Sequence, residues 1–202
     1  MQRSGILFIV SAPSGAGKTT LCDNLRKTPD FHYSVSCTTR PPRKGEVDGE
    51  DYFFIGETLF LQRIKKGWFL EHAVVHGHHY GTPLRAVRDV LVRGKDLLLD
   101  IDVQGAGQIR KSRDRIIRSS LVSVFLTTKT LAELERRLRK RATDDEVTIQ
   151  RRLAAARKEM SHWPEYDYVV FTGSPEEDVQ KFRAIVQAEI WRTSRMRLEK
   201  IF

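Results

Sequence analysis

The chain has 202 residues, of which 40% are hydrophobic and 30% are charged, a composition that excludes a wholly disordered protein, and its apolar runs are too short to span a bilayer. Its two cysteines, Cys22 and Cys37, are too few for a disulfide framework, so we expect a cytoplasmic protein with no membrane partner. The formal net charge of +9 leaves two interpretations open: a nucleic-acid binder, or an enzyme whose arginines converge on a phosphate-rich substrate.

The first half of the chain predicts a core strand and helix followed by a small insertion. Residues 6–10 are a continuous apolar run, typical of a buried parallel strand, and a helix is expected over 18–27. From about residue 31 to 94, short strand-like segments alternate with Gly and Pro, and one amphipathic helix is expected. The strands are predicted at 33–37, 52–55 and 68–75, and the helix at 57–66. We therefore predict a mixed α/β lobe over 34–94, inserted into a core made of 1–33 and 95–202.

The core pattern then resumes. Buried strands are predicted at 97–103, 121–126 and 168–171, the last of them followed by a long C-terminal helix. Between the last two strands lies a charged segment, 128–160, whose leucines recur at helical spacing and predict two amphipathic helices. Strands that alternate with helices predict a doubly wound parallel α/β sheet.

The turn between the first strand and the first helix has a phosphate-binding pattern. It reads Ser11-Ala12-Pro13-Ser14-Gly15-Ala16-Gly17-Lys18-Thr19 and is followed by Thr20. This sequence matches G-x-x-x-x-G-K-[ST] except that Ala12 replaces the first glycine, and its small residues let backbone N–H groups curl around phosphate oxygens. A surface turn with an incidental lysine is the alternative, which the position between strand and helix disfavours. We predict a P-loop NTPase fold in which residues 12–20 bind ATP.

Acidic residues follow the next core strand, where such a loop needs them. Lys18 is predicted to neutralise the β and γ phosphates and the Thr19 hydroxyl to bind Mg²⁺. Asp100 and Asp102 lie on the same side of an extended chain and are expected to hold water on that Mg²⁺. An aspartate that only ends a strand is the ordinary alternative, and the neighbouring P-loop favours the metal.

Further motifs, in this order along the chain, resemble those of guanylate kinases. They are Ser34-Val35-Ser36-Cys37-Thr38-Thr39-Arg40-Pro41-Pro42-Arg43-Lys44-Gly45-Glu46, Asp51-Tyr52-Phe53-Phe54, Glu71-His72-Ala73, Tyr80-Gly81-Thr82 and Asp100-Ile101-Asp102-Val103-Gln104-Gly105. The resemblance implies transfer of the γ-phosphoryl group of ATP to GMP with Mg²⁺ as cofactor. It also implies that the inserted lobe binds GMP and that segment 128–160 is a mobile lid.

The resemblance assigns the GMP site residue by residue. The groups expected at the GMP phosphate are Arg40, Arg43, Tyr52 and Tyr80. Those expected at the guanine are Ser36, Glu71 and Thr82, with Asp100 in the same site. Those expected to close over the transferring phosphoryl group, together with Lys18, are Arg137, Arg141 and Arg152.

Local chemistry supports the arginine assignments. Arg40 and Arg43 flank Pro41-Pro42, which stiffens the backbone between two guanidinium groups suited to a phosphate dianion. Arg137 and Arg141 are four residues apart and so share a helix face. Solvated arginines are the alternative in both places.

Several interpretations remain beside the kinase. A non-catalytic interaction module of the same fold, or a kinase of another nucleoside monophosphate, stays open. Trp163 and Trp191 are expected at apolar-face positions, which disfavours nucleic acid, and the histidines at 76, 78 and 79 are expected in an exposed loop without a metal. The segment Phe171-Thr172-Gly173-Ser174 departs from the expected adenine-binding sequence, so no adenine contacts are assigned. Monomer or homo-oligomer is left undecided.

Overall fold

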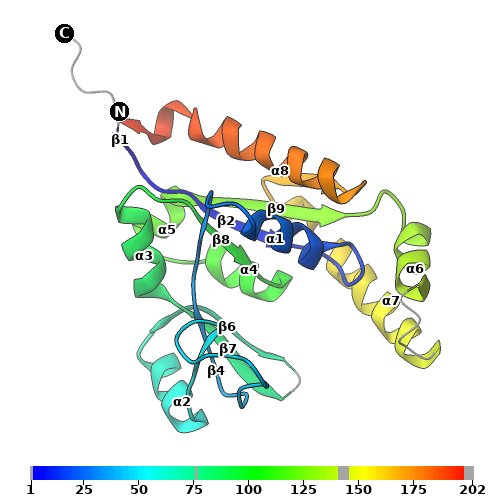
Figure 1. Ribbon diagram of the computed structural model, residues 1–202, viewed down its shortest axis with the longest axis horizontal. Helices are drawn as coiled ribbons and strands as arrows, with labels where there is room; N and C mark the ends of the chain where they lie inside the picture. Colours follow the sequence, from blue (N-terminus) through cyan, green and yellow to red (C-terminus); the bar gives the residue numbers. More distant parts are fainter. Residues whose placement is uncertain (1, 76, 141–145, 198–202) are drawn as a thin grey trace.

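The centre of the fold is a parallel five-stranded sheet with the strand order β10-β9-β2-β8-β3 (Figure 1). The computed structural model describes residues 2–75, 77–140 and 146–197. The strands of this sheet are β2 (Leu7–Ser11), β3 (His32–Tyr33), β8 (Leu97–Asp100), β9 (Leu121–Thr127) and β10 (Tyr168–Phe171). Because all five run in the same direction, their carboxyl ends meet at one edge, where ligands bind in open α/β sheets.

Helices cover both faces of this sheet, so the doubly wound prediction is confirmed. Successive residues of β2 point to opposite faces: Phe8 packs with helices α1 (Lys18–Arg26) and α8 (Pro175–Ile190), and Leu7 and Ile9 pack on the other side. The helices of that other side are α3 (Leu84–Val92), α4 (Val103–Arg110) and α5 (Arg115–Ser120). The near-continuous apolar runs of the core strands follow from burial on both faces.

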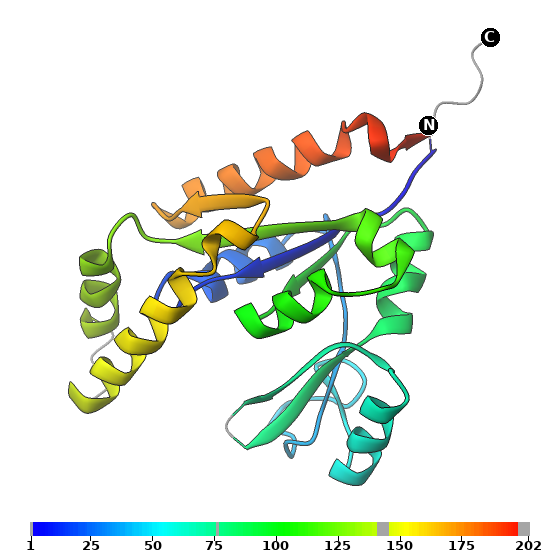
Figure 2. The ribbon, with the colours of Figure 1, turned by 180° about the vertical axis from the view of Figure 1, so that it is seen from behind.

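A second, mixed sheet of four strands forms from residues in the predicted lobe (Figure 2). Its members are β5 (Tyr52–Phe54), β4 (Ser36–Thr38), β7 (His78–Pro83) and β6 (Phe69–Val75), with helix α2 (Glu57–Lys65) beside β6. The ribbon shows this sheet and α2 set apart from the five-stranded sheet. We therefore propose that these elements act as one lobe; α3, which ends the predicted range 34–94, packs against the five-stranded sheet.

The predicted strand at 33–37 is wrong as a single element. His32 and Tyr33 pair with β8 in the core sheet, whereas Ser36–Thr38 pairs with β5 and β7 in the second sheet. The two residues between them carry the chain from one sheet to the other. The sequence pattern does not reveal this break, because both segments are too short for their residue pattern to show that they belong to different sheets.

The strand predicted at 97–103 ends earlier, at Asp100. Asp102 is the N-cap of α4, and its Oδ1 accepts a hydrogen bond from the backbone N–H of Gly105 at 2.7 Å. The carboxylate therefore starts a helix that the sequence analysis did not assign.

The segment expected to form a lid contains the two predicted helices, α6 (Leu131–Lys140) and α7 (Glu146–Met160). Both lie at one end of the five-stranded sheet (Figures 1 and 2). Leu138 packs with Ile149 and Leu153, so the apolar faces of the two helices meet. None of the described helices is long and apolar enough to cross a membrane.

Two expectations about side chains need correction. Trp163 and Trp191 are 53% and 62% exposed, so they do not pack on apolar faces. His78 and His79 lie in strand β7, not in a loop, and the His79 ring stacks on Phe60 at 5.1 Å between centroids. His76 lies outside the described residues.

An ion pair with a buried carboxylate fixes the start of the core strand β2. The two terminal guanidinium nitrogens of Arg3 donate to Asp96, at 2.6 and 2.7 Å, and the N–H of Ile6 donates to the same carboxylate at 2.9 Å. Asp96 is buried, so removal of its carboxylate leaves the buried N–H of Ile6 without its partner and the Arg3 guanidinium without its counter-ion.

We expect Asp96→Ala to lower the free energy of unfolding by about 3 kcal/mol, the scale for breaking one side of a buried ion pair. The control is Asp89, an exposed residue whose Oδ2 lies 3.9 Å from Nε of Arg85. Asp89→Ala should change the free energy of unfolding by less than about 0.5 kcal/mol. Urea denaturation measures both. Equal effects of the two substitutions would contradict the structural role of Asp96.

Candidate active site

The phosphate-binding loop lies between β2 and the first turn of α1, as predicted. Gly15 and Gly17 have φ angles of 90° and 100°, in the left-handed region that favours glycine. Gly17 is the N-cap of α1 and no side chain caps this end, so the backbone N–H groups of the first turn point towards the loop. An anion is favoured there by both the N–H groups and the helix dipole.

Lys18 contacts the end of the neighbouring strand. Its Nζ lies 2.5 Å from Oδ1 of Asp100 and donates to the carbonyl of Ile101 at 3.1 Å. The contact follows from the parallel register, in which Val10 lies opposite Asp100. The structure therefore brings the predicted lysine and one of the two predicted aspartates together, while the side chain of Asp102 caps α4.

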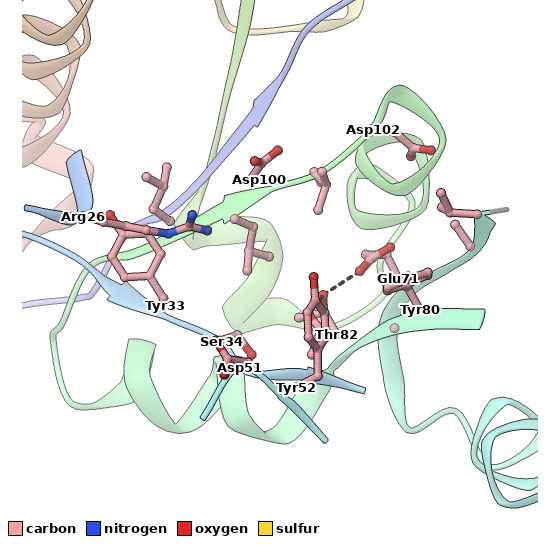
Figure 3. A pocket seen from close by; sticks show the side chains of 17 residues that line it. Arg26, Tyr33, Ser34, Asp51, Tyr52, Glu71, Tyr80, Thr82, Asp100 and Asp102 are labelled. Atoms are coloured by element: carbon pink, nitrogen blue, oxygen red, sulfur yellow. Dashed lines mark hydrogen bonds between the residues drawn. The ribbon is translucent and has the colours of Figure 1, made fainter. Parts of the chain in front are cut away.

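A cavity of about 310 Å³ opens between the two sheets (Figure 3). The predicted residues that line it are Ser36, Tyr52, Glu71, Tyr80, Thr82, Asp100 and Asp102. Figure 3 shows Glu71, Tyr80 and Thr82 grouped together, with Arg26 and Tyr33 at the opposite side. Residues distant in the sequence thus converge on one pocket.

The guanine assignment centres on a buried carboxylate. Glu71 is 8% exposed, and its Oε1 accepts a hydrogen bond from the Thr82 hydroxyl at 2.5 Å. Antiparallel pairing of β6 with β7 places these two residues opposite each other, and the Ser36 hydroxyl lies 3.4 Å from that of Thr82. Burial raises the pKa of Glu71, with a smaller contribution from the charge of Asp102, while the hydrogen bond from Thr82 opposes the rise.

The arginines predicted at the GMP phosphate are not among the residues that line the cavity, although Arg40 contacts two that do. Arg40 donates from Nε to the Tyr80 hydroxyl at 3.3 Å and from Nη2 to Glu46 at 2.8 Å. Its guanidinium carbon is 5.6 Å from the centre of the Tyr52 ring. Arg43 is exposed, and its backbone N–H donates to Glu46 at 2.6 Å. The hydrogen bond from Arg40 lowers the pKa of Glu46.

The lid arginines stand apart from the cavity in this conformation. Arg137 on α6 pairs with Glu133 at 2.6 Å, one helical turn earlier, and Arg152 lies on α7. Neither lines the cavity. Arg141 lies outside the described residues. Among the described residues, no three His, Cys, Asp or Glu side chains are grouped to hold a metal by themselves.

Sequence reasoning missed four lining residues with polar side chains: Arg26, Tyr33, Ser34 and Asp51. The guanidinium of Arg26 lies 5.1 Å from the centre of the Tyr33 ring. The hydroxyls of Tyr33 and Ser34 are buried without a hydrogen-bond partner in the described structure. Ser34 belongs to the motif Ser34-Val35-Ser36, which drew attention only to Ser36. Arg26 had no such pattern around it.

Comparison with known proteins identifies the family of the chain. The sequence profile of guanylate kinase matches residues 4–189, which is most of the chain. The chain belongs to the guanylate kinase family. The guanylate kinase of Paramagnetospirillum magneticum is 45% identical over 190 residues, 94% of this chain and 87% of that protein. The Escherichia coli K12 guanylate kinase is also 45% identical, over 96% of this chain and 92% of its own length.

A solved structure supports the same assignment. The crystal structure of guanylate kinase from Anaplasma phagocytophilum superposes with a TM-score of 0.74 at 33% identity, covering 96% of this chain and 91% of that one. The predicted family and the predicted P-loop α/β fold are both confirmed.

The raised pKa of Glu71 leads to a stability prediction for this guanylate kinase. The folded state holds the Glu71 proton more tightly than the unfolded state, so burial of its charge costs stability as pH rises above the ordinary glutamate value of about 4.5. Glu71→Gln keeps an acceptor for Thr82 and carries no charge. We expect the variant to gain stability relative to the parent between pH 4 and pH 7, as measured by thermal unfolding without nucleotide.

Glu50→Gln, at an exposed loop position, provides the control and should show no such pH-dependent gain. If the Glu71 variant loses stability relative to the parent as the pH rises, burial does not penalise the ionised Glu71.

Proposed function

We propose that this guanylate kinase transfers the γ-phosphoryl group of ATP to GMP, giving ADP and GDP, through the residues described above. The observation that supports these roles most directly is the shape of one cavity. Glu71 and Thr82 line it from the lobe, and Asp100, which pairs with the P-loop lysine, lines it from the core. A nucleotide bound to the lobe would therefore lie close to the phosphate loop.

In this proposal Glu71 selects the base. Guanine presents two adjacent donors, N1–H and the N2 amino group, and one carboxylate can accept from both. The hydroxyls of Ser36 and Thr82 can donate to O6. Adenine offers an acceptor at N1 and lacks the 2-amino group, so it would leave the buried Glu71 carboxylate without donors.

The GMP phosphate would bind beside the aromatic pair Tyr52 and Tyr80, whose ring centroids are 5.9 Å apart. Arg40, hydrogen-bonded to Tyr80, would supply positive charge at that place, with Arg43 on the same loop. Glu46 already holds Arg40, which favours one orientation of its guanidinium group.

In the transfer step, a GMP phosphate oxygen would attack the γ-phosphorus in line and the β–γ bridging oxygen would leave with ADP, without a covalent enzyme intermediate. The backbone N–H groups of residues 12–20 would bind the ATP phosphates. Lys18 would exchange its contact with Asp100 for a phosphate oxygen. Arg137, Arg141 and Arg152 would approach when the lid closes and stabilise the charge on the transferring group.

The oxygen donors near the phosphate loop suit Mg²⁺ better than a softer metal. Thr19 would bind it directly and Asp100 and Asp102 through water; one oxygen of Asp102 is already used to cap α4. When bound, Mg²⁺ would neutralise charge on the β and γ phosphates. No larger protein cage is expected, because Mg²⁺ usually keeps several waters and phosphate ligands.

A non-catalytic module of this fold would not need the P-loop lysine or the lid arginines, which this chain has. A kinase of another nucleoside monophosphate is the nearer alternative, and it predicts no role for the Glu71 carboxylate. A cytoplasmic location and the absence of a nucleic-acid partner stay predictions, and monomer or homo-oligomer stays undecided.

Lys18→Ala should reduce the rate of phosphoryl transfer by roughly 10²–10³, the scale for losing one preorganised charge donor. Exposed Lys65, at the end of α2, provides a matched control: Lys65→Ala should retain full activity. A coupled assay of ADP formation with ATP, Mg²⁺ and GMP measures both. A folded Lys18 variant with normal turnover would remove Lys18 from the phosphate site.

The base specificity is tested by kcat/KM for GMP, IMP and AMP. We expect GMP to be best, IMP to be weaker because it lacks the 2-amino donor, and AMP to be poorest, by up to ~10⁴-fold. Glu71→Gln should reduce the value for GMP more than those for the other two. Equal values for AMP and GMP in the parent protein would contradict guanine selection while leaving the kinase assignment intact.

A further inference from the structure

A carboxylate of α7 contacts the phosphate loop. Oε2 of Glu159 accepts a hydrogen bond from the backbone N–H of Ser14 at 3.1 Å. The side chain is half-buried, and burial raises the pKa of Glu159 while the Ser14 hydrogen bond opposes the rise. A negative charge beside a loop that binds phosphate is unfavourable unless it serves another purpose.

Apolar packing joins the same two elements. Ala16 of the loop is fully buried against Leu134 of α6 and Ala156 of α7. A methyl group added at Gly15 would lie 2.9 Å from the side chain of Leu138, so the loop and the α6 helix are in close contact. The base of the lid and the phosphate loop therefore form one packed unit, and Glu159 adds its directional contact.

The hydrogen bond to Glu159 uses a different backbone N–H group from those available for phosphate. The N–H of Ala16 donates to the carbonyl of Pro13 at 3.1 Å. Within the described structure, the backbone N–H groups of Gly15, Gly17 and Lys18 donate to no backbone carbonyl. Those three N–H groups are left for phosphate oxygens, while Glu159 accepts from the N–H of the Pro13–Ser14 peptide.

The helix that carries Glu159 also carries a lid arginine. Arg152, Ala156 and Glu159 are spaced i, i+4 and i+7 and so share one face of α7. Ala156 and Glu159 both contact the loop, so this face is turned towards it. The Glu159 contact thus joins the face of α7 that carries Arg152 to the loop.

We propose that Glu159 is a positioning residue for ATP: through the N–H of Ser14 it holds the Pro13–Ser14 peptide at the start of the phosphate loop and joins the helix that carries Arg152 to that loop. The inference rests on the proposed function of the loop as the ATP site. Glu159 acts through the backbone of Ser14 and does not itself touch the substrate.

A different role would give the opposite behaviour. A carboxylate that only occupies the place of a phosphate oxygen would have to leave before ATP binds, and its removal would strengthen ATP binding.

The test compares Glu159→Ala with Glu159→Gln, which keeps an acceptor oxygen. We expect Glu159→Ala to raise the KM for ATP about tenfold, the scale of one lost hydrogen bond to a charged group, and to lower kcat. The KM for GMP should change less than twofold, and Glu159→Gln should stay within about threefold of the parent. Glu176→Gln, on an exposed first turn of α8, provides the control with no change.

Three outcomes would overturn the proposal: a lower KM for ATP in Glu159→Ala, equal increases for ATP and GMP, or a loss of melting temperature with unchanged KM values. A Gln variant as poor as the Ala variant would also contradict the acceptor role. Direct calorimetric titration with ATP repeats the comparison without GMP. If the parent protein binds ATP but does not phosphorylate GMP, the proposed function is contradicted. The Glu159 inference is then decided by the calorimetric titration alone.

Discussion

The pairing of β2 with β8 is the constraint on which the site depends. Parallel register places Val10 opposite Asp100, and the chain turns into the phosphate loop just after β2. Lys18 therefore meets Asp100 across the edge of the sheet, and Asp100 also lines the cavity between the two sheets. One strand pair thus connects the proposed ATP and GMP sites. The second sheet and the helices α6 and α7 are arranged around this edge.

The chain enters the lobe through a short crossing between sheets. Tyr33 still pairs with β8, and Ser36 already belongs to the second sheet. The residues at this crossing line the cavity, so a shift of the lobe relative to the core would change the width of the pocket. A two-residue connection with few backbone hydrogen bonds suits such a motion.

Carboxylates removed from water, one buried and one half-buried, carry a cost in this site. Burial raises the pKa values of Glu71 and Glu159. The folded protein therefore disfavours the ionised form of these two side chains more than it would at an exposed position. Such a cost is common where a protein prepares groups for a ligand that is absent in the free state. Glu71 would recover it through the donors of guanine, whereas Glu159 is already used within the protein, on the backbone of the phosphate loop.

The sequence by itself determined the parts of this protein that depend on local pattern. The apolar runs around residues 6–10, 121–126 and 168–171 predicted core strands, because a strand buried on both faces must be apolar throughout. The loop that ends in Gly17-Lys18-Thr19 was recognisable because a phosphate needs small residues and a lysine at fixed spacing. Glu71 and Thr82 followed from family resemblance, and their contact at 2.5 Å required the pairing of β6 with β7.

Tertiary structure alone decided which residues of separate elements meet. Arg26 faces the cavity from the last turn of α1, a position where sequence pattern indicates only a solvated helix end. Glu159 reaches Ser14 across 145 positions, and no local spacing encodes a contact at that separation. The exposure of Trp163 and Trp191 was misjudged for the same reason, because burial depends on what packs against a side chain. Each of these features depends on contacts between residues far apart in the sequence, which a local pattern does not contain.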